Sequence, residues 1–126
     1  MARKEINAPD AVAVGPYSHA VDADGLIFLS GQTPVDPATG KLVEGDIKAQ
    51  TEQVFKNLFT VLKAAGLNSD DVQKVNIFLM DMNDFPAMNE VYAKQFTKPY
   101  PARSTIGVAG LPLDARIEIE MIAKKS

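Results

Sequence analysis

The chain of 126 residues contains no cysteine and no tryptophan, and it has a single histidine. Without cysteine it can form neither disulfides nor thiolate metal sites, and it has no cysteine nucleophile. A zinc site is also disfavoured, because one histidine supplies too few of the usual nitrogen and sulfur ligands. We therefore expect no bound metal.

The sequence also lacks clusters of basic residues, long apolar runs and glycine-rich phosphate-binding loops. The formal net charge is -3, and no lysines or arginines cluster beyond Lys124 and Lys125 near the C-terminus. Nucleic-acid binding needs such clusters, so it is disfavoured. No apolar run approaches the ~18 residues of a membrane helix, and no glycine-rich phosphate loop is present. The first ten residues lack the apolar segment of a secretory signal, and we expect a cytoplasmic protein.

The composition is that of a globular chain, with 46% hydrophobic and 23% charged residues. We expect one domain over residues 1–126. A hairpin is predicted over residues 18–31, because Asp24-Gly25 strongly favours a tight turn. Its second arm, 25–31, is apolar at consecutive positions, which predicts a strand buried on both faces. Residues 33–43 hold two prolines and a glycine and should form a loop.

Two helices and three strands are predicted in the rest of the chain. Apolar residues recur at helical spacing after Asp46, a good N-cap, until Gly66. Residues 71–80 alternate as in a strand, and 83–96 form a second helix, for which Asp84 is a good N-cap and Pro86 is tolerated in the first turn. Residues 103–110 and 115–123 form two final strands. This order predicts an α+β fold with a mixed β-sheet and both helices packed on one face.

The last strand divides its residues between two faces. Ile117, Ile119 and Met121 lie on one side, and Glu118 and Glu120 on the other. If the apolar side meets the helices, the opposite face of the sheet combines carboxylates with the apolar residues of the early strands. Such a surface is rarely left in water, so we expect it to pack against other copies of the chain. The alternative is a solvated outer face with a few stray apolar residues.

Arg103 and Thr105 share one face of the strand over 103–110, and Glu118 lies on the strand that follows it. If the two strands form an antiparallel pair, Arg103 and Glu118 could line one small pocket. Arginine binds carboxylates with two parallel hydrogen bonds, and a neighbouring carboxylate can accept a proton from water. The alternative is a plain cross-strand ion pair.

Further candidates lie in turns and at the ends of elements. Tyr17 follows a Gly-Pro turn, the Ser30 hydroxyl and the Gly31 N–H could donate to a small ligand at the end of a strand, and Asn89 lies on the second helix. Each of these residues also has a purely structural explanation. His19 has no orienting partner at a recognisable spacing, so a surface or hydrogen-bonded structural histidine is the better interpretation.

Taken together, these segments resemble the RidA/YjgF family, also called L-PSP, over nearly the whole chain. The shared motifs, in order, are "GPYS", "SGQ", "NDF…N…Y", "PARS" and "LP…IEIE". The resemblance implies a chorismate-mutase-like α+β fold and a homotrimer with pockets between subunits. It implies hydrolytic deamination of reactive 2-enamines and 2-imines, such as 2-aminoacrylate and 2-aminocrotonate, to 2-oxo acids and ammonia, with no cofactor.

The resemblance also implies roles for individual residues. Arg103 matches the arginine that binds the substrate carboxylate, and Glu118 matches the glutamate that positions the attacking water. The positions that match pocket-lining, substrate-binding residues are Tyr17, Ser30, Gly31, Asn89 and Thr105. Many relatives carry a cysteine at the position of Thr105, so thiol-based regulation is excluded here.

Two rival functions stay open at this stage. Some members of the family are described as ribonucleases or translation inhibitors, which predicts a basic groove that this acidic chain does not offer. A trimer that binds small carboxylates without converting them, or acts as a chaperone, would use the same arginine.

Overall fold

The computed structural model describes residues 2–11 and 15–126. Six strands form one sheet in the order β1-β2-β3-β8-β6-β7. Their bounds are β1 Lys4–Ile6, β2 Ala20–Ala23, β3 Leu26–Gln32, β6 Val72–Leu79, β7 Ala102–Gly107 and β8 Ile117–Lys124. Only β6 and β7 pair in parallel, and the other neighbours are antiparallel. The expected mixed sheet is therefore confirmed.

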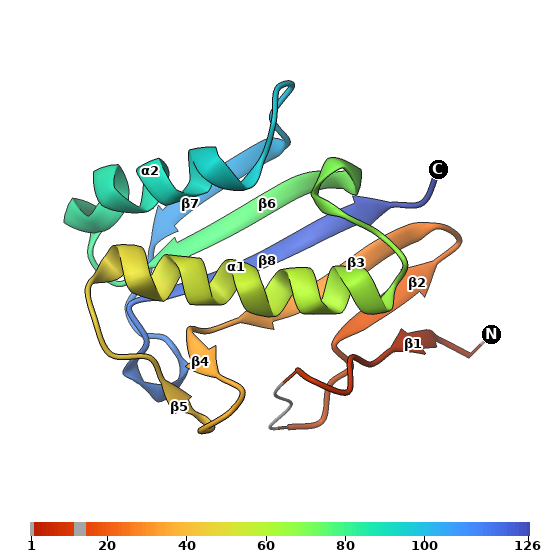
Figure 1. Ribbon diagram of the computed structural model, residues 1–126, viewed down its shortest axis with the longest axis horizontal. Helices are drawn as coiled ribbons and strands as arrows, with labels where there is room; N and C mark the ends of the chain where they lie inside the picture. Colours follow the sequence, from red (N-terminus) through yellow and green to blue (C-terminus); the bar gives the residue numbers. More distant parts are fainter. Residues whose placement is uncertain (1, 12–14) are drawn as a thin grey trace.

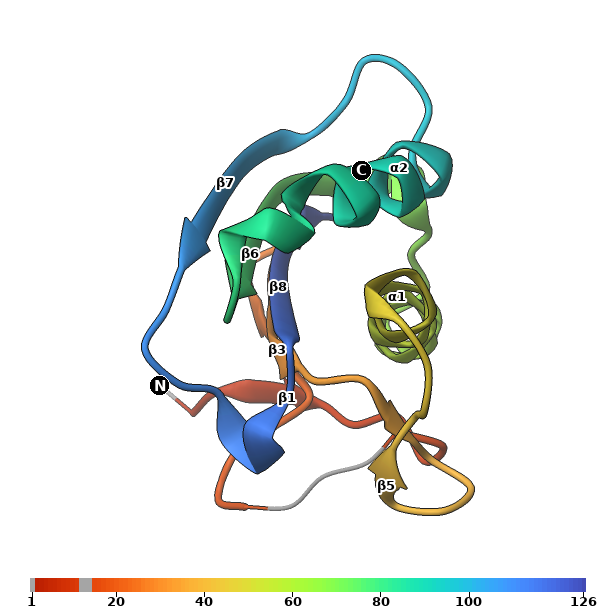
Figure 2. The same ribbon diagram turned by 90° about the vertical axis from the view of Figure 1, so that its left-hand side faces the viewer.

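Both long helices cover the same face of the sheet, as expected (Figures 1 and 2). Helix α1 spans Ile47–Ala64 and helix α2 spans Phe85–Gln95. The Asp46 side chain accepts a hydrogen bond from the Ala49 N–H at 2.9 Å, so Asp46 caps α1 as predicted. A 3-10 turn, η2 at Met82–Asp84, leads into α2, and the Asp84 side chain makes no capping bond.

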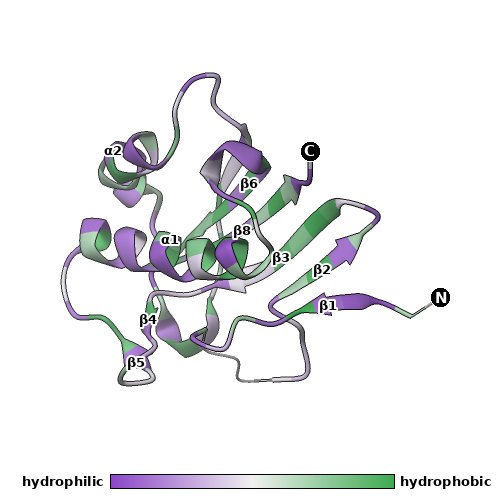
Figure 3. Cartoon of the chain, turned by 45° about the vertical axis from the view of Figure 1, so that its right-hand side comes forward, coloured by the Kyte–Doolittle hydropathy of each residue, from purple (hydrophilic) through white to green (hydrophobic). Residues whose placement is uncertain are grey.

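The core lies between the helices and the central strands. Alternation in β6 and β8 directs Val75, Ile77, Ile117, Ile119 and Met121 toward the helices, and each is almost completely buried. This division of faces agrees with the sequence pattern. Figure 3 shows green, hydrophobic segments along the central strands β3, β6 and β8.

No helix of the described residues 2–11 and 15–126 covers the opposite face of the sheet, which we call the open face. It carries exposed apolar side chains, with Leu26 38%, Phe28 43% and Ile106 51% exposed. The expectation that β3 is buried on both faces is therefore wrong for the single chain, in which only Ile27 and Leu29 of the apolar run are buried. The open face does combine apolar and charged residues, as the last strand predicted.

Three local predictions need correction. Residues 33–43 are not all loop, because β4 (Val35–Asp36) and β5 (Lys41–Leu42) form a small separate hairpin. The Ser30-Gly31 pair does not end its strand, because β3 continues to Gln32. The last two strands are not neighbours, since β6 lies between β7 and β8. The remaining short elements are the 3-10 turns η1 (Ser69–Asp71) and η3 (Pro112–Asp114).

Candidate functional site

Arg103 lies on β7 beneath helix α2. It is the parallel neighbour of Val75, whose side chain points into the core, so Arg103 lies on the helix-covered face. Its guanidinium donates a hydrogen bond to Asn89 Oδ1 at 2.6 Å. The guanidinium carbon also lies 4.5 Å from the centre of the Tyr92 ring and 5.4 Å from that of Phe85. Helix α2 thus fixes the orientation of the charged group through one hydrogen bond and two cation–π contacts.

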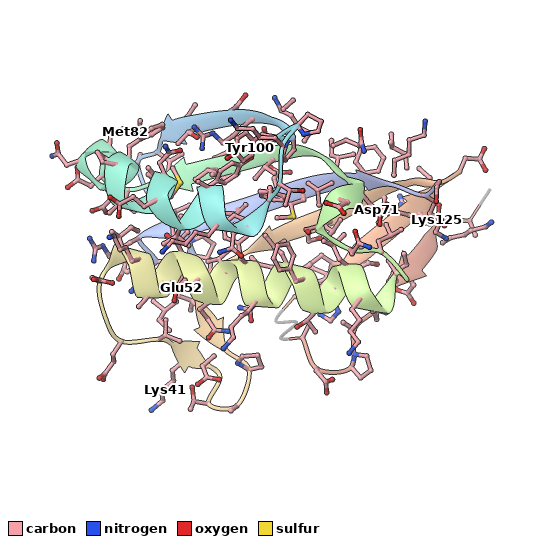
Figure 4. All side chains as sticks on the ribbon, turned by 45° about the horizontal axis from the view of Figure 1, so that its top comes forward. Lys41, Glu52, Asp71, Met82, Tyr100 and Lys125 are labelled. Atoms are coloured by element: carbon pink, nitrogen blue, oxygen red, sulfur yellow. The ribbon has the colours of Figure 1, made fainter. Side chains whose placement is uncertain are left out.

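A cavity of about 370 Å³ opens beside this guanidinium, and we call it the arginine cavity. Its lining comes from α2 and from the segment that leads into β7, namely Asn89, Tyr92, Ala93, Tyr100, Pro101 and Arg103. Figure 4 labels Tyr100, which lies past the C-terminal end of α2, and Met82, which lies before its N-terminal end. Half-buried and already oriented, Arg103 can bind an anion at a lower entropic cost than a free surface arginine.

Glu118 lies on the open face, in a second cavity of about 600 Å³ that we call the glutamate cavity. The lining residues are Tyr17, Ser30, Gly31, Gln32, Thr33, Val35, Gly40, Pro112, Leu113 and Glu118. Burial raises the pKa of Glu118 above its ordinary value of 4.5, and the negative charge of Glu120 raises it further. A carboxylate with a raised pKa is a better base than a solvated one, which suits proton transfer from water.

The structure contradicts the expected proximity of Arg103 and Glu118 within one chain. Arg103 is aligned with Val75, and Val75 with Met121, whereas Glu118 pairs with Phe78 across the same strand. The two residues are therefore two strands and three positions apart. Spacings of ~3.3 Å per residue and ~4.8 Å per strand give a Cα separation of roughly 14 Å. They also point to opposite faces of the sheet, so no small molecule can contact both in one chain.

All of the predicted binding residues except Thr105 line one of the two cavities. Tyr17, Ser30 and Gly31 lie with Glu118, and Asn89 lies with Arg103. Ser30 differs from expectation, because its hydroxyl donates to the Ser18 carbonyl at 2.7 Å instead of pointing a proton at a ligand. Its oxygen keeps lone pairs that can accept hydrogen bonds.

Thr105 lies two residues after Arg103 on the same face and lines neither cavity. Its hydroxyl oxygen is buried and has no hydrogen-bond partner among the described residues. The Tyr92 hydroxyl is also buried and has no hydrogen-bond partner among the described residues. Two buried hydroxyls without partners near one arginine are unfavourable for stability, because each has lost its hydration.

Several residues of these cavities were not selected from the sequence. Tyr92 lines the arginine cavity, and the Phe85 ring also lies beside the Arg103 guanidinium. The contact of both rings with Arg103 depends on the position of β7. A signal was present, since Phe85, Asn89 and Tyr92 follow one another at spacings of four and three residues on one helical face. Leu113 was also missed. It is 61% exposed and adopts a left-handed backbone with φ of 62°, at the wall of the glutamate cavity.

His19 is a buried structural residue, as the sequence favoured. Its Nδ1 accepts the backbone N–H of Ala8 at 2.9 Å, and its carbonyl accepts the Ser30 N–H at 2.9 Å. It therefore ties the N-terminal segment to β3.

Over 2–11 and 15–126, no three histidine, aspartate or glutamate side chains are grouped as metal ligands. Within the same ranges, neither helix is long and apolar enough to cross a membrane.

Comparisons with known proteins agree with this fold. The family model "Endoribonuclease L-PSP" matches residues 5–125. A mouse protein named 2-iminobutanoate/2-iminopropanoate deaminase is 46% identical over 122 residues, which is 96% of this chain and 90% of its own. The chain belongs to the L-PSP family, which is the RidA/YjgF family that the motifs predicted.

Solved structures place the fold in the same family. The crystal structure of RidA from an Antarctic Psychrobacter is 44% identical and covers 98% of this chain and 100% of its own, with a TM-score of 0.93. The structure of Escherichia coli TdcF with bound serine is 41% identical, covers 98% of this chain and 99% of its own, and gives a TM-score of 0.90. The chorismate-mutase-like α+β fold is therefore confirmed.

Proposed function

We propose that this protein is a reactive-intermediate deaminase that hydrolyses 2-enamines and 2-imines to 2-oxo acids and ammonia. The observation that carries this proposal is the 46% identity, over 96% of the chain, to a protein named for that reaction. The cavities of this chain fit the same chemistry. One holds an oriented guanidinium and the other a carboxyl group with a raised pKa.

Arg103 binds the carboxylate of the substrate in this proposal. A guanidinium presents two parallel N–H donors to the two carboxylate oxygens, and Asn89 together with the rings of Tyr92 and Phe85 holds it in place. A relative of known structure binds serine, an amino acid with the same α-carboxylate. We therefore expect small 2-imino and 2-oxo acids as ligands.

Glu118 activates the water. The enamine first becomes the imine when its carbon takes up a proton from water and its nitrogen gives one back. A water molecule then attacks the C=N carbon while Glu118 accepts its proton, so that a C–O bond forms and the C=N π bond breaks. Glu118 returns this proton to nitrogen, which gives a carbinolamine. The hydroxyl proton of the carbinolamine then passes to nitrogen as the C–N bond breaks and the C=O bond forms, so that ammonia leaves the 2-oxo acid. No redox change occurs and the protons balance, so the reaction requires no cofactor.

A homotrimer brings the two groups together in this account. Arg103 lies on the edge strand β7, and Glu118 lies on the open face with the exposed side chains of Leu26, Phe28 and Ile106. If the β7 edge of one copy packs on the open face of the next, each site combines Arg103 of one subunit with Glu118 of another. A head-to-tail contact of this kind closes into a ring, and the family resemblance indicates three members. The expected mass in solution is about 41 kDa, three times 13.6 kDa.

A coupled assay tests this function. Threonine dehydratase would generate 2-aminocrotonate, and release of 2-oxobutanoate would be followed with and without the purified protein. We expect the wild type to accelerate release above the spontaneous rate and Arg103→Ala to abolish the acceleration. A trimeric wild type that gives no acceleration would exclude the enzyme hypothesis.

A carboxylate-binding trimer without catalysis is the second candidate, because Arg103 would serve it equally well. Glu118→Gln distinguishes the two. If the protein only binds carboxylates, the wild type shows no turnover, and Glu118→Gln keeps the affinity for 2-oxobutanoate. If it is a deaminase, Glu118→Gln still binds 2-oxobutanoate but loses most of the turnover that the wild type shows. RNA cleavage, the activity that the family description names, would have to survive Arg103→Ala and depend on salt.

The cytoplasmic location stays a prediction.

A further inference from the structure

Strand β3 contains a bulge next to the glutamate cavity. Leu29 pairs with Met121 and Gln32 pairs with Ile119, so the register shifts between these two pairs. Three steps along β3 match two steps along β8, and Ser30 and Gly31 together oppose the single residue Glu120. An extra residue of this kind bends a strand and redirects the neighbouring side chains, often beside active sites.

The bulge allows both flanking residues to face the core. Leu29 and Gln32 are both buried although they are three residues apart, a spacing that would put them on opposite faces of a regular strand. The extra residue is therefore accommodated at Ser30-Gly31, where β3 passes the Glu118 side chain.

Gly31 lies in very close contact with Glu118. A Cβ atom built on Gly31 would be 2.7 Å from Glu118 Oε2, 3.0 Å from its Cδ and 3.2 Å from its Cγ. Carbon and oxygen atoms that are not bonded do not approach so closely, so a side chain at position 31 would displace the carboxylate.

The backbone does not itself require glycine at this position. The φ angle of Gly31 lies outside the left-handed range, unlike those of Gly25, Gly40 or Gly66. Alanine could adopt this conformation, and an exchange of glycine for alanine at a compatible site is normally neutral or slightly stabilising. The space next to Glu118 is the remaining constraint.

We propose that Gly31 is a positioning residue for Glu118: the bulge at Ser30-Gly31 and the missing side chain leave the space in which the Glu118 carboxylate lies at the cavity wall. This inference rests on the proposed deaminase function, because it assigns a catalytic consequence to the position of Glu118. It goes beyond the family resemblance, which makes Gly31 a pocket-lining residue.

The test compares Gly31→Ala with Gly110→Ala. Gly110 is a matched control, because a Cβ there meets no atom within 4 Å and its φ is also outside the left-handed range. Glu118 is flexible and can turn away, so Gly31→Ala should fold, with a melting temperature close to that of wild type. We expect its kcat in the coupled assay to fall on the order of 100-fold, as for a ~1 Å misplacement, with a smaller change in KM. Gly110→Ala should match the wild type.

A double-mutant cycle separates positioning from a general structural role. In the Glu118→Gln background, Gly31→Ala should cause little further loss of kcat, because the group that it displaces no longer acts as a base. If the two losses instead multiply, Gly31 acts independently of Glu118 and the proposal is wrong.

A measurement without substrate keeps this test apart from the proposed function. The carboxyl 13C signal of Glu118, assigned by its absence in Glu118→Gln, would be titrated in wild type and both alanine variants. We expect the pKa of Glu118 to fall in Gly31→Ala, because the displaced carboxylate loses part of its burial while Glu120 stays in place. An inactive wild type would refute the deaminase function alone. An unchanged pKa and a wild-type kcat in Gly31→Ala would overturn the positioning role.

Discussion

Replacing Arg103 with lysine separates the geometry of the guanidinium from its charge. Lysine keeps the positive charge but lacks the fork of donors that reaches Asn89 and a carboxylate together, and it stacks less well on Tyr92. The structure shows the contacts at risk, a hydrogen bond of 2.6 Å to Asn89 and ring contacts at 4.5 and 5.4 Å.

The expected size of the effect follows from these contacts. A hydrogen bond to a charged group contributes about 1.5–3 kcal/mol, and an exposed cation–π contact about 0.5–1 kcal/mol. Because lysine keeps part of each interaction, we expect a net loss of about 2–3 kcal/mol, which lowers kcat/KM roughly 30- to 150-fold. The carboxylate is present in substrate and transition state alike, so most of the loss should be a rise in KM.

The assay is 2-oxobutanoate release with threonine dehydratase, measured over a range of dehydratase activities. Arg3→Lys is the matched control, because Arg3 is exposed near the N-terminus and lines neither cavity. We expect it to match the wild type. Wild-type kcat/KM in Arg103→Lys would refute the reasoning, since it would show that neither the fork nor its aromatic support matters.

Three further predictions concern charge, pH and stability. Glu120→Gln should lower the pKa of Glu118 by removing a neighbouring negative charge, so the acid limb of kcat against pH should move to lower pH. Glu118→Gln should unfold at a higher temperature than wild type at pH 7, and the difference should disappear below pH 4.5. The raised pKa of Glu118 means that the folded state binds the proton more tightly than the unfolded state, so ionisation of Glu118 above pH 4.5 destabilises the fold. An equal gain in unfolding temperature at all pH values would contradict this pH dependence. Asp46→Ala should lower the free energy of unfolding by about 1 kcal/mol and Tm by about 3–5 °C, because it removes the N-cap of α1. Asp46→Asn keeps a capping oxygen and should leave Tm unchanged. An unchanged Tm in Asp46→Ala would contradict the capping role.

Local patterns in the sequence were sufficient to predict most of the elements. Helix α1 and strand β6 have strong periods of 3.6 and 2 residues, and the Asp24-Gly25 turn defines the β2–β3 hairpin. The faces of β8 were also correct, because alternation alone determines which side chains point the same way. These features depend only on residues that are close together in the chain.

The order of strands could not be obtained in this way. Consecutive strands are neighbours more often than not, and this tendency favoured a β7–β8 hairpin. In the structure β6 lies between them, because the chain crosses over after β7 and returns through η3. Arg103 and Glu118 were therefore predicted to be close in one chain, and the structure places them on opposite faces.

The bulge at Ser30-Gly31 had a sequence signal that was interpreted differently. A glycine inside an apolar strand indicates either a bulge or a close approach, and both occur here. Local sequence predicts that the strand ends at Ser30-Gly31, because nothing local shows that it continues to Gln32. Neither the contact with Glu118 nor the width of the cavity is visible without the pairing partner.

The central claim is that each site takes Arg103 from one subunit and Glu118 from another. Arg103→Ala, which should be inactive, and Glu118→Gln, which should keep only a small residual kcat, would be unfolded together in equal amounts, refolded and assayed with the two unmixed proteins as controls. In randomly mixed rings of three, about a quarter of the sites would have both native residues. We therefore expect the mixture to recover about a quarter of the activity of the same amount of wild type. Mixed trimers that stay as inactive as the separate variants would contradict it.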